Sequence, residues 1–85
     1  MTTYEIEFAK SAQKELKKLE PDIRLRIFKS VYSLSHDPRK GNVRPMVGTK
    51  SWRLRVDKYR IIYDIYDKKL IILIIKVGHR KDIYR

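Results

Sequence analysis

The chain has 85 residues, of which 21 are Lys or Arg and 10 are Asp or Glu, giving a formal net charge of +11 at pH 7. It contains no cysteine, which excludes disulfides and thiolate chemistry. The apolar run at residues 70–77 is too short to span a bilayer, and residues 1–10 lack the pattern of a signal peptide. We therefore expect one small cytoplasmic domain, residues 1–85, with a polyanionic partner. Nucleic acid is the first candidate, and an acidic protein or a membrane surface fits the same charge.

The first half of the chain predicts a strand followed by two helices. Apolar and polar residues alternate over residues 3–8, as expected for a half-buried strand. Residues 11–20 carry apolar side chains at helical spacing, and Pro21 suits the first turn of a second helix. That helix has one apolar stripe, formed by Ile23, Ile27, Phe28, Val31 and Leu34. The two helices form a predicted hairpin that ends near residues 36–41, where Pro and Gly are stop signals.

The second half predicts a loop followed by three strands. Residues 42–51 are expected to form an ordered loop. The strands are predicted at residues 52–56, 59–66 and 70–77, the last buried on both faces, with turns at residues 57–58 and 67–69. The element order is β-α-α-β-β-β. We therefore predict an α+β fold in which a helical hairpin packs on one face of a mostly antiparallel sheet.

Arginines gather on one face of the first predicted hairpin of strands. A two-residue turn at Asp57 and Lys58 places Arg55 opposite Arg60, and strand alternation puts Arg53 on the same face. Like charges directly opposite each other repel and lower stability. The pattern therefore favours an anion site, because a planar guanidinium donates two parallel hydrogen bonds to phosphate. The alternative is a solvated face on which salt screens the repulsion.

The tail at residues 78–85 is predicted to return to these arginines. If the last strand pairs antiparallel with residues 59–66, its end lies beside Arg60, and Arg80 can join the cluster. A metal site is not expected, because there is no Cys and the two histidines are far apart in the chain. The matching chemistry is metal-free RNA cleavage, in which cations stabilise the charged phosphorane and Tyr84 stacks on a base. Composition alone fits simple binding of RNA or DNA equally well.

The segment at residues 52–85, with "YRIIY" and the ending "VGHRKDIYR", resembles a RelE-type toxin of the RelE/ParE superfamily. The resemblance implies a RelE-like fold and a ribosome-dependent endoribonuclease, an mRNA interferase that cuts messenger RNA in the ribosomal A site. It implies no cofactor and no membrane. The implied partners are the ribosome, messenger RNA and a cognate RelB-like antitoxin, with operator DNA bound only through the antitoxin complex.

The resemblance also implies roles for single residues. Arg60 matches a phosphate-binding arginine, and Arg80 matches an arginine that stabilises the transition state or the leaving group. Tyr84 matches a tyrosine that stacks on a base and helps position or activate the 2′-hydroxyl. Arg53 and Arg55 match two basic positions that are lysines in the best-known member. Because arginine does not readily give up a proton, the general base is left open. His79 is the candidate, with a tail histidine that hydrogen-bonds backbone as the alternative.

Two other functions fit parts of the sequence. A ParE-like toxin has the same fold but poisons DNA gyrase, and such proteins typically lack the arginine–tyrosine tail that Arg80 and Tyr84 supply. A plain nucleic-acid-binding module would bind with a steep dependence on salt and would not arrest growth.

Overall fold

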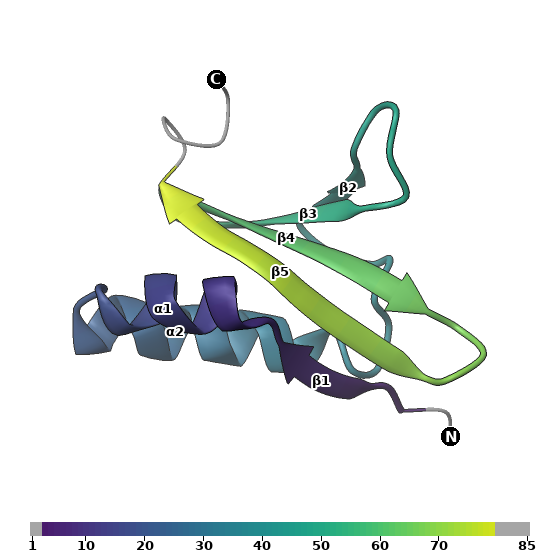
Figure 1. Ribbon diagram of the computed structural model, residues 1–85, viewed down its shortest axis with the longest axis horizontal. Helices are drawn as coiled ribbons and strands as arrows, with labels where there is room; N and C mark the ends of the chain where they lie inside the picture. The colour runs from purple at the N-terminus through teal and green to yellow at the C-terminus, as the bar shows by residue number, and fades with distance from the viewer. Residues whose placement is uncertain (1–2, 80–85) are drawn as a thin grey trace.

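Two helices and a five-stranded sheet make up the fold of the computed structural model, which describes residues 3–79 (Figure 1). In chain order the elements are β1 (Glu5–Phe8), α1 (Lys10–Lys17), α2 (Pro21–Ser33), β2 (Val43–Pro45), β3 (Trp52–Val56), β4 (Tyr59–Tyr66) and β5 (Ile71–His79). The strand order in the sheet is β1-β5-β4-β3-β2. β1 runs parallel to β5, and the other neighbours are antiparallel. The predicted α+β class, with a helical hairpin on one face of a mostly antiparallel sheet, is confirmed.

The helical hairpin follows the predicted pattern closely. Pro21 is the first residue of α2, where its missing N–H removes no helical hydrogen bond. Ile27 and Val31 are buried on the side of α2 that faces the sheet. No helix in the described part of the chain is long and apolar enough to cross a membrane.

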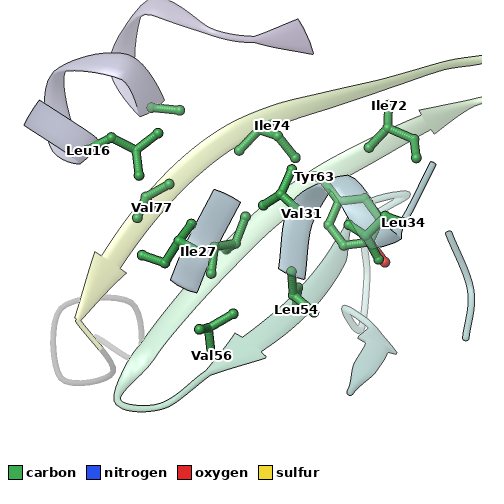
Figure 2. Close-up of a cluster of buried hydrophobic side chains, with 12 residues drawn as sticks. Leu16, Ile27, Val31, Leu34, Leu54, Val56, Tyr63, Ile72, Ile74 and Val77 are labelled. Carbon is green, nitrogen blue, oxygen red and sulfur yellow. The ribbon is translucent and has the colours of Figure 1, made fainter. Parts of the chain in front are cut away.

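The core fills the space between the helices and one face of the sheet. Figure 2 shows Leu16 of α1, Ile27 of α2, Leu54 of β3 and Ile74 of β5 pointing into this layer. Tyr63 of β4 is fully buried, and its hydroxyl donates a 2.6 Å hydrogen bond to the carbonyl of Pro38. Burial raises the pKa of Tyr63, so its hydroxyl stays protonated as a donor.

The opposite face of the sheet carries no described helix, and this corrects one prediction. We expected residues 70–77 to be buried on both faces, but only Ile72, Ile74 and Val77 are buried. The alternate side chains of β5, such as Leu73, stay half-buried because no element of residues 3–79 packs over them. The helix-covered side of the sheet is the inner face, and the other side is the outer face.

A second correction concerns residues 42–51, which we predicted as a loop. They contain β2, which pairs with β3 as the edge of the sheet. Three residues are too few to show alternation, and Pro45 argues against a strand in most contexts. An edge strand tolerates proline because the side without a neighbour needs no N–H donor.

α1 covers the edge of β5 where β1 has ended. The last residue pair of the β1–β5 ladder is Phe8 with Ile74. Beyond it, the Ser11 hydroxyl donates to the carbonyl of Ile75 at 2.8 Å, and the Val77 N–H donates to a Glu15 carboxylate oxygen at 3.4 Å. Side chains of α1 therefore form hydrogen bonds with backbone groups of β5 that no neighbouring strand pairs with beyond the end of β1.

Candidate functional site

The hairpin of β3 and β4 places the predicted arginines as expected. Arg55 lies directly opposite Arg60, and Val56 lies opposite Tyr59. The two-residue turn starts at Asp57, which has a φ of 52°, a left-handed conformation that Asp tolerates better than most residues. Asp57 also accepts a 2.9 Å ion pair from Arg26 of α2. This contact between two exposed side chains links the turn to α2.

A pocket of about 300 Å³ lies on the outer face over these strands, and we call it the arginine pocket. Its lining consists of Gly41, Asn42, Val43, Arg44, Arg53, Arg55 and Arg60. The lining holds four arginines and no acidic residue, so the pocket attracts anions. Arg60 is only 5% exposed, Arg53 is partly exposed, and Arg44 and Arg55 are open to solvent. The charge therefore extends from the floor of the pocket to its rim.

Arg44 is a site residue that sequence reasoning missed. It lies on β2 directly opposite Arg53, so it stands on the outer face with the other arginines. The neighbouring Asn42 carbonyl accepts a 3.0 Å hydrogen bond from the N–H of Arg55, which holds the start of β2 against β3. The only sequence signal was the apolar-basic pair Val43–Arg44 ahead of a strand. That signal is too short to establish a strand without its partner.

The segment before Gly41, which leads into the pocket wall, is anchored by Arg39. Its guanidinium contacts both carboxylate oxygens of Asp67, at 3.3 and 2.8 Å, and lies 6.0 Å from the centre of the Trp52 ring. Asp67 also accepts a 2.6 Å hydrogen bond from the hydroxyl of Tyr4. The hydrogen bonds from Arg39 and then Tyr4 lower the pKa of Asp67, and the bond to Asp67 raises the pKa of Tyr4. This cluster ties the wall to the turn between β4 and β5.

His79 lies on the inner face, across the sheet from the arginine pocket. It pairs with Tyr59, whose ring it meets edge-on at 5.6 Å between centroids. Small hollows beside it are lined by residues of both helices, among them Glu15 and Ile23. The role of His79 as general base stays a prediction, and the position of its ring lends it no support.

The predicted return of the chain end to the arginines holds as far as the structure describes it. β5 runs antiparallel to β4, and Gly78 lies directly opposite Arg60. Because glycine has no side chain, Gly78 itself places none beside Arg60 on the outer face. Arg80 and Tyr84 lie outside the described residues, so their proposed roles stay predictions.

Metal-binding groups are not gathered anywhere in residues 3–79. No cluster of three or more His, Asp or Glu side chains there could hold a metal ion, and the whole sequence has no cysteine. The four arginines of the pocket lining suit an anion, because guanidinium groups donate charge-assisted hydrogen bonds and carry fixed positive charge.

Comparison of the sequence with known proteins identifies a family and several relatives. The sequence model of the family described as ParE toxin of type II toxin–antitoxin system, parDE, matches residues 6–84. The mRNA interferase toxin RelE of Escherichia coli (strain K12) is 30% identical over 80 residues, which cover 92% of this chain and 84% of that protein. Toxin RelG of Mycobacterium tuberculosis is 36% identical over 86 residues, covering 96% and 97% of the two chains.

Solved structures of related toxins share the fold. The chain matches one in the toxin–antitoxin complex RelBE2 from Mycobacterium tuberculosis with a TM-score of 0.86 and 28% identity, covering 94% of both chains. It matches one in the intact Escherichia coli RelBE complex with a TM-score of 0.79 and 26% identity, covering 89% of this chain and 95% of the other. The chain therefore belongs to the RelE/ParE superfamily, as a RelE-type toxin of a type II toxin–antitoxin system.

Proposed function

We propose that this toxin is a metal-independent endoribonuclease that cuts messenger RNA in the A site of the ribosome. The observation that carries the proposal is the arginine pocket, with four guanidinium groups and no acidic residue in its lining. Two relatives named mRNA interferase support the reaction class. Such a pocket suits a reaction in which negative charge develops on a phosphate.

The reaction is an internal transfer of a phosphodiester. The 2′-oxygen of one nucleotide forms a bond to the adjacent phosphorus as its proton passes to a base. The bond from phosphorus to the 5′-oxygen of the next nucleotide then breaks, and that oxygen takes up a proton. The products are a 2′,3′-cyclic phosphate and a free 5′-hydroxyl. The phosphorane between these steps carries extra negative charge, so the main requirement is for cationic donors.

Arg60 is the best-placed described residue for stabilising that charge. Its guanidinium is buried at the floor of the pocket, where an electrostatic interaction is stronger than in water. Arg55 lies opposite it on the adjacent strand, and Arg53 adds a phosphate contact two residues along. In this proposal Arg80 stabilises the leaving group and Tyr84 stacks on a base and orients the 2′-hydroxyl. His79 stays a candidate base.

The proposed partners follow from the relatives. The matched solved structures include complexes of RelE toxins with RelB antitoxins from bacteria and archaea. We propose that a RelB-like antitoxin binds this chain, and that the toxin reaches operator DNA only through that complex. The formal charge of +11 suits an acidic antitoxin and the ribosome, whose RNA surface is anionic.

Cleavage on programmed ribosomes tests the proposal directly. Purified toxin is added to ribosomes stalled with a defined A-site codon, and the RNA ends are mapped. We expect cleavage in the A site by the wild type and at least a roughly hundredfold loss in Arg55→Ala, Arg80→Ala and Tyr84→Phe. Lys14→Ala, which removes one charge from an exposed position on α1, is the matched control and is expected to cleave normally. Full activity in both Arg80→Ala and Tyr84→Phe would contradict the mechanism.

A sulfur substitution tests whether a metal ion takes part. Replacing a non-bridging oxygen of the scissile phosphate with sulfur should slow cleavage, because sulfur accepts hydrogen bonds from guanidinium poorly. Added Mn²⁺ or Cd²⁺ should not restore the rate. Recovery of the rate with a thiophilic ion would show that a metal contacts that phosphate and would overturn the metal-free chemistry.

Gyrase inhibition is the second candidate, because the matching family is described as ParE toxin. It predicts DNA breaks linked to gyrase in expressing cells, with messenger RNA left intact. Mapping DNA breaks and RNA ends in the same induced culture separates the two activities.

A further inference from the structure

A β-bulge interrupts the ladder between β4 and β5. Ile62 of β4 lies opposite Lys76 of β5. The next residue of β4, Tyr63, lies opposite Ile74, so Ile75 is an extra residue that no residue of β4 faces. An extra residue of this kind bends the bulged strand and increases its local twist. We therefore expect residues 76–79 to take a different direction from residues 71–74.

The spacing of buried side chains along β5 agrees with the bulge. Ile72 and Ile74 are two residues apart, as strand alternation requires. The next buried residue, Val77, follows three residues later, and Lys76 beside it is exposed. If the strand ran on without a bulge, this sequence would turn Lys76 toward the core. Because burial of a charged ammonium group is costly, packing of the core favours the bulged arrangement.

The bulge lies where β5 exchanges a neighbouring strand for a helix. The ladder with β1 ends at Ile74, whose carbonyl accepts a 2.8 Å hydrogen bond from the N–H of Ala9. The carbonyl of Ile75 accepts a 2.8 Å hydrogen bond from the hydroxyl of Ser11, in the first turn of α1. The extra residue is therefore held by a side chain of α1.

We propose that the bulge at Ile75, held by Ser11, sets the direction in which β5 ends and so positions the chain beside the arginine pocket for cleavage. Gly78 lies opposite Arg60 three residues beyond the bulge. The predicted catalytic residues of the tail come directly after β5 in the sequence and lie outside the described residues. Ile75 and Ser11 are positioning residues, because neither lines the pocket. Their effect on cleavage rests on the proposed nuclease function, whereas the bend in β5 does not.

Deletion of Ile75 removes the bulge and keeps every pair of the ladder. Lys76 then follows Ile74 directly, so both strands advance one residue at a time and the buried side chains keep their faces. On programmed ribosomes we expect kcat to fall at least about tenfold and KM to change less than about twofold, because the pocket is retained while the end of β5 is misdirected.

Ile75→Ala is the matched control for the deletion. It shortens a half-buried side chain but keeps the extra residue and its carbonyl, so kcat should stay within about twofold of the wild type. A deletion variant that cleaves like the wild type would overturn the proposal. So would a loss in Ile75→Ala as large as the loss in the deletion variant.

Ser11 gives a milder test in a chain of full length. Ser11→Ala removes the donor to the Ile75 carbonyl and should lower kcat about threefold, whereas Ser11→Thr keeps a hydroxyl and should cleave like the wild type. Urea midpoints of both variants separate this effect from loss of folded protein. The Ser11 variants decide the proposal if the deletion variant does not fold, and equal kcat in Ser11→Ala and wild type would then contradict it.

Residual dipolar couplings test the bend without RNA. Couplings of the backbone N–H groups report the angle between residues 71–74 and residues 76–79 in the full chain. We expect deletion of Ile75 to change that angle and Ile75→Ala to preserve it, and an unchanged angle in the deletion variant would overturn the proposal. A changed angle, in a toxin whose wild type does not cut RNA on ribosomes, supports the bend and contradicts only the nuclease function.

Discussion

The inner and outer faces of this sheet are made from the same strands but serve different purposes. On β4, Ile61 and Tyr63 point inward and are fully buried beneath the helices, whereas Arg60 points outward and lines the arginine pocket. The inner face carries apolar side chains that pack into the core. The outer face sets like charges directly opposite each other, at Arg55 and Arg60 and again on β2 and β3, which opposes folding. The chain therefore holds its cluster of arginines on the face of the sheet that no described helix covers.

Neighbouring isoleucines of β5 give the strongest contrast between the faces. Ile72 is fully buried on the inner face, and Ile71 is half-buried on the outer face. Ile72→Ala should lower the free energy of unfolding by about 2–5 kcal/mol, from lost burial and the cavity left behind. Ile71→Ala should cost about 1 kcal/mol or less, because its surroundings are already partly solvated. Urea denaturation of both variants measures the difference, and equal losses would contradict a one-sided core.

The arginine pair offers the next contrast, in which stability and activity should move in opposite directions. Arg55→Thr removes one of two facing charges and adds a good strand former, so we expect unfolding to require about 0.2–1 kcal/mol more. A-site cleavage and phosphate binding should fall in the same variant. Unfolding midpoints and cleavage rates, measured on one preparation, show both effects.

Lys76→Thr is the matched control for that variant. Lys76 is an exposed cation of β5 that faces Ile62 rather than another charge, and it is not part of the pocket lining. Its replacement should leave cleavage intact and bring no relief of cross-strand repulsion. A destabilised Arg55→Thr protein would show that the facing arginines do not repel in the folded chain.

Much of this arrangement could be predicted from local pattern. The two-residue turn at residues 57–58 fixes the register of two strands, and register fixes which side chains share a face. The pairing of Arg55 with Arg60 across the two strands can therefore be predicted from a few residues of sequence. β2 could not be predicted in the same way, since three residues show no period and the strand exists only through its pairing with β3. Arg44 was missed for that reason.

His79 shows that position along the chain does not fix the face of a side chain. Its place at the end of β5 brings it near Arg60 in the ladder, and its role as general base stays a prediction. Alternation along the strand puts it beside Tyr59 on the inner face, as Val77 two residues earlier also indicates. Where a strand ends and which face a side chain occupies are separate properties. The alternation of side chains along the strand decides the face.

The smallest expected effect concerns the anchor of the pocket wall, where Arg39 holds Asp67. Because the pKa of Asp67 is lower in the folded chain than its ordinary value of 3.8, the charged carboxylate stabilises the fold. That contribution is complete above the ordinary pKa and is lost as pH falls through the folded pKa. Both partners are exposed, so the gain at neutral pH is slight. Asp67→Asn should lower the urea midpoint slightly at pH 7, and the gap from the wild type should narrow as the pH falls below the ordinary pKa of 3.8. A gap of constant size across that range would mean that the charge of Asp67 does not hold the wall in place.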